Sequence, residues 1–204
     1  MSRNSLITVA LGDSYRRQAE AMVASFRRFH DWPVTILSDA DPRVFNTRYV
    51  HTMRLDAGAR LAKLNMNLFC ATNHVLYLDA DTRVVAPLDA GMRALEAGFD
   101  MALAHSANQG DEWLWNCGTE DRDATALDFM SQPVALQAGA VFFNYQTTLR
   151  LFAAWREEWH RFRDQDQASL LRALHRRPVA LWLFSDRYHG QNGQVIRHLF
   201  GRRG

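Results

Sequence analysis

The chain has 204 residues, of which 48% are hydrophobic and 23% are charged. This balance is typical of a globular protein and excludes a disordered chain, and the length suits one domain. The formal net charge is +2, and no basic run stands apart from balancing acids. We therefore expect no nucleic-acid partner.

Cysteine usage and hydropathy bear on the cellular compartment. The two cysteines, Cys70 and Cys117, have the spacing of neither a metal site nor a disulfide framework, which predicts free thiols in a reducing environment. The N-terminal segment does not resemble a signal peptide, and no apolar run is long enough to span a membrane. We therefore expect a cytoplasmic protein without a transmembrane segment, and peripheral contact with a membrane stays compatible with the sequence.

Predicted strands and helices alternate along the first part of the chain. Short apolar runs predict strands, and apolar residues at helical spacing predict helices. In chain order these are a strand at 6–11, a helix at 15–30, a strand at 34–37, a helix at 56–72 and a strand at 75–78. Asp56 is expected to cap the second of these helices. The inner face of that helix is expected to carry Leu61, Leu64, Leu68 and Phe69.

This alternation predicts an α/β fold, a Rossmann-like and mostly parallel central sheet flanked by helices. In such sheets ligands bind beyond the carboxyl ends of the strands. Two predicted strands end in polar segments, 12–15 and 79–81, which would meet at that edge.

The second half is less regular. A long loop is expected at 106–133, and long loops in compact domains are often functional. The other predicted elements are a helix at 87–97, strands at 101–105 and 137–144, helices at 149–162 and 164–177, and strands at 179–184 and 195–200. Asp164 or Asp166 would cap the last helix.

Asp79 and Asp81 directly follow the apolar strand at 75–78. Their like charges repel, and a strand end is a costly place to leave them unpaired. A divalent cation resolves the conflict, because Mg²⁺ and Mn²⁺ prefer carboxylate oxygens and also bind diphosphate oxygens. The pair favours a metal site over a solvated turn. It indicates a reaction in which a nucleoside diphosphate is the leaving group, because a metal can neutralise the negative charge that develops on that group.

The same string, VLYLDADT, also opens the active site of haloacid-dehalogenase-like phosphatases. There Asp79 would be the nucleophile and Asp81 the general acid. That family needs a downstream basic residue, usually lysine, and a later acidic metal motif. No lysine follows Lys63 and no clear motif of that kind follows Asp81, so the phosphatase is kept as the alternative.

From Thr8 to Gly201 the chain resembles the GT-A glycosyltransferases, most of all glycosyltransferase family 8, the glycogenin and lipopolysaccharide-galactosyltransferase group. The segments that carry the resemblance are VALGDSY, RLAKLNMNLF, VLYLDADTRVVAPLD, QAGAVFFN, DQDQASL and VIRHLFG. The resemblance implies a GT-A fold. It also implies a hexosyltransferase that moves a sugar from a nucleotide-diphosphate sugar, such as a UDP-sugar, to an acceptor hydroxyl with retention of configuration.

The resemblance also implies site residues. Asp79, Asp81 and His198 would bind the metal, and an imidazole beside two carboxylates suits Mn²⁺ better than Mg²⁺. Asp166 and Gln167 would be the catalytic residues beside the transferred sugar. The donor-binding residues would be Leu11, Asp13, Tyr15, Lys63, Asp79, Ala80, Asp81, Gln137, Ala138, Gly139, Gly201 and Arg202.

Some of these residues have a specific expected role. Tyr15 would stack on the base, Lys63 would add positive charge, and Gly139 would let the backbone approach the donor closely. The lysine that ends the family motif falls on Gly204, so Arg202 or its neighbour Arg203 would take its place.

We predict one domain over residues 1–204, with 1–82 as the nucleotide-binding half and 83–204 as the metal and acceptor half. Trp113 and Trp115 either stack on a carbohydrate acceptor or alternate along a half-buried strand. A non-catalytic nucleotide-sugar-binding protein is a third interpretation.

Overall fold

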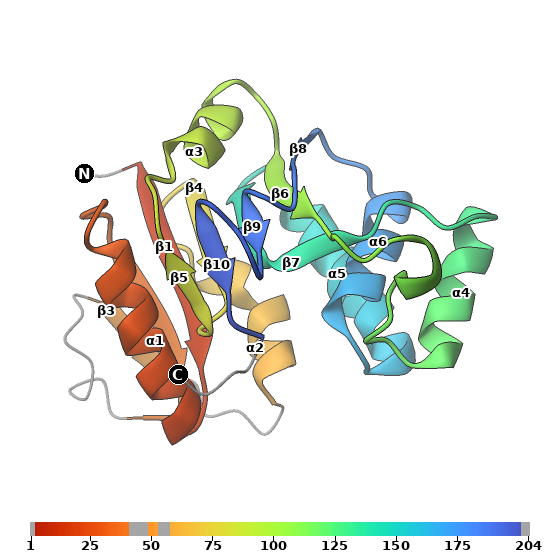
Figure 1. Ribbon diagram of the computed structural model, residues 1–204, viewed down its shortest axis with the longest axis horizontal. Coiled ribbons are helices and arrows are strands. Elements are labelled where there is room, and N and C mark those ends of the chain that lie inside the picture. Colours follow the sequence, from red (N-terminus) through yellow and green to blue (C-terminus); the bar gives the residue numbers. More distant parts are fainter. Residues whose placement is uncertain (1–2, 41–48, 53–57, 201–204) are drawn as a thin grey trace.

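A seven-stranded sheet forms the middle of the molecule (Figure 1). The structure is a computed structural model, and it describes residues 3–40, 49–52 and 58–200. The strand order is β3-β2-β1-β4-β7-β6-β8. The strands are β1 Asn4–Ala10, β2 Val34–Ser38, β3 Tyr49–Thr52, β4 His74–Leu78, β6 Met101–His105, β7 Leu136–Asn144 and β8 Leu181–Phe184.

The sheet is mostly parallel, as predicted. Strands β3, β2, β1 and β4 are parallel to one another, β8 is parallel to β6, and only β7 runs antiparallel to both of its neighbours. Strands β1, β2 and β4 are buried along almost their whole length because helices cover both faces of the sheet.

Helices on the two faces give two separate cores. On one face, Leu6 and Leu76 of the sheet pack in one cluster with residues of α1 and α3. On the other face, Ile7 and Val75 pack with residues of α2, α5 and α6, as expected from the alternation of side chains along a strand. The helices are α1 Asp13–Phe26, α2 Ala59–Leu64, α3 Asp89–Glu96, α4 Thr119–Phe129, α5 Leu149–Phe162 and α6 Asp166–Arg176.

A small second sheet brings the end of the described chain back to its middle. It has the order β5-β10-β9, and its strands are β5 Thr82–Val84, β9 His189–Gly190 and β10 Ile196–His198. The backbone N–H of Leu199 donates to the carbonyl of Asp81 at 2.9 Å. This pairing places His198 beside Asp81, although 117 positions separate them in the sequence.

The prediction of a loop at 106–133 is wrong. This segment contains the short 3₁₀ helix η3 (Gly110–Glu112) and the helix α4. The buried residues of α4 are Asp121 and Thr125, which are polar and hydrogen-bond to Arg172 of α6. A helix that packs through an ion pair lacks the apolar periodicity on which the prediction relied.

The helix predicted at 56–72 is shorter than expected. It forms α2 and then a separate 3₁₀ helix, η2 (Met66–Phe69). The two meet at Asn65, whose backbone N–H and side-chain amide both donate to the carbonyl of Leu61. Leu68, predicted on the inner face, is 64% exposed. Asp56, the predicted cap, lies outside the described residues.

Strands β3 and β9 were not predicted. No helix in the described part of the chain has the length and apolar character to cross a membrane.

Candidate functional site

The predicted site residues converge on one cavity. This cavity, of about 950 Å³, lies beyond the carboxyl ends of β1 and β4. The predicted residues that line it are Leu11, Tyr15, Lys63, Asp79, Ala80, Asp81, Gln137, Ala138, Gly139, Asp166, Gln167 and His198.

One predicted residue in the described part of the chain, Asp13, lies outside the cavity lining. The side chain of Asp13 forms an ion pair with Arg16, is largely exposed, and does not line the cavity. Gly201 and Arg202 lie outside the described residues, as does Arg203.

The turn after β4 presents the two acids. The N–H of Asp79 donates to the carbonyl of Gly139 at 2.8 Å, which extends the pairing of β4 with β7 by one residue. The chain then reverses, and both the N–H and the hydroxyl of Thr82 donate to the carbonyl of Asp79. Asp79 and Asp81 are thus held by backbone pairing at the sheet edge.

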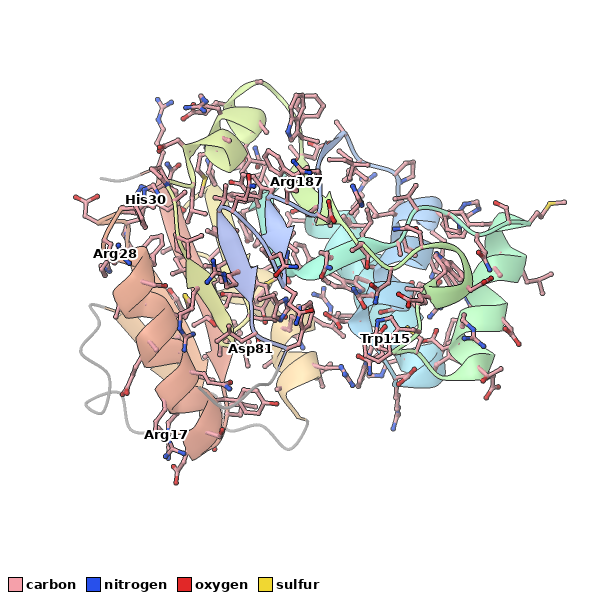
Figure 2. All side chains as sticks on the ribbon, viewed as in Figure 1. Arg17, Arg28, His30, Asp81, Trp115 and Arg187 are labelled. Atoms are coloured by element: carbon pink, nitrogen blue, oxygen red, sulfur yellow. The ribbon has the colours of Figure 1, made fainter. Side chains whose placement is uncertain are left out.

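Asp79, Asp81 and His198 offer ligand atoms that all lie within 4.8 Å of one another. His198 Nε2 is 3.1 Å from Asp81 Oδ1 and 3.9 Å from Asp79 Oδ2. Asp81 is labelled near the lower ends of β5 and β10 (Figure 2). Two carboxylates and one imidazole form a donor set that fits Mn²⁺.

Gly139 of β7 keeps this cluster open. A Cβ atom at position 139 would lie 2.5 Å from Cε1 of His198 and 2.8 Å from Oδ2 of Asp79. Real Cβ atoms do not approach other atoms so closely, so any other residue would displace two of the three candidate ligands. The glycine therefore lets the His198 ring and the Asp79 carboxylate approach the backbone of β7.

A second buried histidine, His189, contacts the ring nitrogen of His198 that faces away from Asp81. His189 Nε2 lies 3.2 Å from His198 Nδ1, and His189 is 1% exposed. Burial, followed by the neighbouring His198, lowers the pKa of His189 well below its ordinary value, so this ring is neutral. The Phe200 ring stacks on the His198 ring with centroids 4.2 Å apart. His198 is therefore fixed at Nδ1 and across its ring face.

Lys63 joins two of the predicted acids. Its Nζ lies 2.5 Å from Asp166 Oδ2 and 3.2 Å from Asp79 Oδ1, and the residue is buried. Burial alone would raise the pKa of Asp166 and lower that of Lys63. The attraction between the two charges outweighs burial, so the pKa of Asp166 lies below its ordinary value and that of Lys63 lies above it.

The Tyr77 hydroxyl is a second hydrogen-bond donor to Asp79 Oδ1. It donates to that oxygen at 2.6 Å. Burial and the Asp79 charge raise the pKa of Tyr77 well above its ordinary value, so the hydroxyl keeps its proton. Among the described contacts of Asp79, Oδ1 is thus taken by protein donors, while Oδ2 faces His198.

Gln167 follows Asp166 in the first turn of α6 and is held by two hydrogen bonds. Its Nε2 donates to the carbonyl of Leu136, and its Oε1 accepts from Asn116 Nδ2, both at 2.9 Å. Asp164, predicted as a cap of this helix, instead accepts from the N–H of Gly118, which precedes α4. The two predicted catalytic side chains therefore have fixed positions in the cavity wall.

Tyr15, in the first turn of α1, also lines the cavity. Its side chain is 51% exposed, which leaves a ring face open to a ligand. The preceding Gly12 has a φ of 79°, and its N–H donates to both carboxylate oxygens of Asp39 at 3.0 and 3.1 Å. The turn between β1 and α1 thus depends on a left-handed glycine.

The two tryptophans of segment 106–133 have different environments. Trp113 is 2% exposed, and its indole N–H donates to the carbonyl of Pro133. Trp113 is therefore a core residue. It neither stacks on a carbohydrate acceptor nor belongs to a half-buried strand. Trp115 is 65% exposed and lines a second cavity.

Sequence reasoning missed Tyr77, Asn116 and His189 as parts of the site. Tyr77 had a usable signal. It lies two positions before Asp79, on the same face of an extended chain, and it alone carries a polar group in the otherwise apolar segment 75–78. Asn116 and His189 had none, because their contacts depend on how α4 and β9 pack.

Comparisons with known proteins identify the fold. The sequence matches no protein-family model and no curated protein. Solved structures do match. Mouse xyloside xylosyltransferase 1 superposes with a TM-score of 0.63 at 10% identity, over 98% of both chains. An active-site glutamine-to-glutamate mutant of LgtC gives 0.66 at 14% identity, over 97% of this chain and 87% of that one.

The glycosyltransferase GlyE of Streptococcus pneumoniae gives a TM-score of 0.65 at 16% identity, and the match covers 97% of this chain but 54% of GlyE. Two of these neighbours are glycosyltransferases by title, and the third title names an active-site mutant of LgtC. The chain is therefore a single α/β domain with the fold of the GT-A glycosyltransferases.

Proposed function

We propose that this chain is a metal-dependent glycosyltransferase. It would move a hexose from a nucleotide-diphosphate sugar, preferably a UDP-sugar, to an acceptor hydroxyl. One observation carries the proposal: Asp79, Asp81 and His198 meet within 4.8 Å in the wall of a cavity of about 950 Å³. A cavity of this size is at the upper end of the range for small-molecule sites and has room for a nucleotide sugar.

Asp79, Asp81 and His198 would hold Mn²⁺, which when bound neutralises the charge that builds on the departing nucleoside diphosphate. Lys63 holds the carboxylates of Asp79 and Asp166 in place through its ion pairs. Tyr15 would stack its exposed face on the base. Gly201 and Arg202 are proposed to contact the diphosphate, on the resemblance alone.

Asp166 and Gln167 are proposed to act on the transferred sugar. The pKa of Asp166 lies below its ordinary value, so its carboxylate is charged and would stabilise positive charge at the anomeric carbon. Gln137, Ala138 and Gly139 would border the sugar. Retention of configuration is proposed on the resemblance to family 8, as is the division of the domain into a nucleotide half and a metal and acceptor half.

The test is turnover of a panel of nucleotide sugars in Mn²⁺ and in EDTA, with UDP-glucose and UDP-galactose first and UDP-xylose as the pentose comparison. We expect Mn²⁺-dependent release of the nucleoside diphosphate. Asp81→Ala should lower this rate at least about 100-fold, because several kcal/mol of charge stabilisation are lost. Asp123→Ala, at an exposed acid on α4, is the matched control and should keep the full rate.

Full turnover in EDTA would rule out the metal-dependent chemistry. Binding of a nucleotide sugar without turnover would instead identify a non-catalytic relative. Hydrolysis of a simple phosphomonoester would support the phosphatase alternative, which the glycosyltransferase neighbours do not favour.

A further inference from the structure

A second cavity adjoins the first and belongs to no function assigned above. Its volume is about 530 Å³. Four residues line both cavities: Asn116, Gln137, Gln167 and Phe200. Because Gln137 and Gln167 border the proposed sugar position, a ligand in the second cavity would lie next to the sugar end of the donor rather than its base.

The lining of this cavity is rich in carboxamides. The six amide side chains are Asn108, Asn116, Gln137, Gln167, Gln191 and Asn192. Each carboxamide offers both donors and acceptors, and so does each hydroxyl group of a sugar. The charged residues among those lining it are one acid, Asp186, and one base, Arg187. The lining therefore suits a neutral, polyhydroxylated ligand and offers no excess charge for a phosphate or a carboxylate.

Trp115 adds an apolar surface at this cavity. It is 65% exposed, which is unusual for such a large apolar side chain. The turn that carries it is anchored beneath by the buried Trp113 and Leu114, and Leu114 adopts a left-handed φ of 48°. Trp115 is thus displayed on a fixed turn (Figure 2). Its ring face can stack on the apolar face of a sugar ring.

We propose that the second cavity binds the acceptor, and that the acceptor is a neutral saccharide whose ring stacks on Trp115. This inference rests on the proposed function. An acceptor hydroxyl oxygen would form a bond to the anomeric carbon of the donor sugar as the bond from that carbon to the diphosphate oxygen breaks. The bonding electrons leave with the nucleoside diphosphate, and the hydroxyl proton is released to solvent.

The experiment uses the full chain, Mn²⁺ and the nucleotide sugar that it hydrolyses. Nucleoside diphosphate release and glycosylated product are measured with methyl β-xyloside, methyl β-glucoside, methyl β-galactoside and lactose. Glucuronic acid, glucose 6-phosphate and a serine-containing peptide are the comparison acceptors. We expect a neutral glycoside to form product and to raise release above the rate of hydrolysis alone, while the charged sugars and the peptide do not.

Trp115→Ala should raise the acceptor KM about tenfold, as expected for loss of one aromatic stacking contact. The matched control is Trp182→Ala, at an exposed tryptophan of β8 outside both cavities, which should leave the acceptor KM unchanged. Saturation-transfer NMR of the same glycosides should show a weaker signal with Trp115→Ala, independently of turnover.

The outcomes separate the two proposals. Failure to turn over any nucleotide sugar would overturn the proposed function, and this inference with it. Donor hydrolysis that no neutral glycoside accelerates would overturn the acceptor assignment alone. An unchanged acceptor KM in Trp115→Ala would do the same, as would preferred transfer to the peptide.

Discussion

The two oxygens of Asp79 have different neighbours, and this difference defines the geometry of the candidate metal site. Oδ1 accepts from Tyr77 at 2.6 Å and from Lys63 at 3.2 Å. Oδ2 lies 3.9 Å from His198 Nε2. Because Oδ1 is engaged by two protein donors, Oδ2 is the oxygen that would bind a cation together with Asp81 and His198.

His189 should control the metal affinity of His198. A cation can bind His198 Nε2 only if that nitrogen carries no proton, so the ring hydrogen must lie on Nδ1 and be donated to the neutral His189. Loss of such an outer partner typically weakens metal binding about 10- to 100-fold. We expect that loss in the Mn²⁺ Kd of His189→Ala, measured by calorimetry without substrate.

Two variants make this prediction specific. His189→Asn retains an acceptor and should recover part of the affinity, whereas His175→Ala, on α6 and outside the cavity, should not change it. Equal Mn²⁺ affinity in wild type and His189→Ala would show that His189 only fills space.

Among single residues, the sequence predicted those that stand in a recognisable motif. Asp79 and Asp81 were predicted from their own spacing, and His198 only through an ordered resemblance. His189 could not be predicted, because its role depends on the parallel pairing of β9 with β10. Asp13 was predicted from its position, yet Arg16, one helical turn later, draws its side chain away from the cavity.

The helices α4, α5 and α6 are joined by a buried group of charges rather than by apolar side chains alone. Arg172 is 1% exposed and donates to Asp121 Oδ1 at 2.5 Å and to Glu158 Oε2 at 3.0 Å. Glu158 also accepts from Arg161 and Arg176. Because α6 begins with Asp166 and Gln167, this group positions the helix that carries the proposed catalytic residues.

Glu158→Gln should destabilise the protein by about 3 kcal/mol at pH 7, because it leaves a buried arginine with one partner fewer. Urea unfolding measures the change. Glu157→Gln is the matched control, since Glu157 is largely exposed and pairs only with Arg176 among its described contacts. A Glu158→Gln loss no greater than that of Glu157→Gln would contradict a structural role for this charge group.

The same variant carries a pH signature. Burial alone would raise the pKa of Glu158, but hydrogen bonds from Arg161, Arg176 and Arg172 outweigh burial and lower it. A lowered carboxyl pKa adds stability above the unfolded value, about 4.3, and this contribution is lost as the pH falls through the folded value. The gap between wild type and Glu158→Gln should therefore begin to narrow below about pH 4.3 and vanish as the pH falls through the lowered folded pKa of Glu158. Burial raises the pKa of Asp121, so the titration of Asp121 changes the stability in the opposite direction. Comparing wild type with Glu158→Gln separates the contribution of Glu158, because Asp121 is present in both.

Element prediction succeeded where helices bury apolar stripes, as in α1 and α5, and where strands are buried on both faces. It failed at α4, whose inner face carries Asp121 and Thr125. It also failed at α2, where Asn65 ends a helix that the apolar spacing would continue.

For the molecule as a whole, the candidate metal site joins parts of the chain that are distant in sequence. Asp79 and Asp81 follow β4 of the large sheet, whereas His198 ends β10 of the small one. A cation bound to all three would bind the folded chain and not the unfolded one. Its binding free energy should therefore appear as stability.

Mn²⁺ at about 100 times its Kd should add about 2.7 kcal/mol, which for a chain of this size raises Tm by about 5–10 °C. Scanning calorimetry in Mn²⁺ and in EDTA measures the shift. Mg²⁺ should give a smaller shift because imidazole is a poorer ligand for it. Asp81→Ala should abolish the Mn²⁺ effect, and a shift that persists in this variant would place the ion elsewhere.

The sequence contains a single lysine, Lys63, and the structure buries it between Asp166 and Asp79. No other side chain carries a primary amine, so acylation by an amine-reactive reagent can modify only one side chain. With its pKa above the ordinary value, the folded chain should react there slowly at neutral pH. The extent of Lys63 acylation, read by mass spectrometry of the peptide that contains it, would therefore report how often the site opens, with no substrate or assay of turnover.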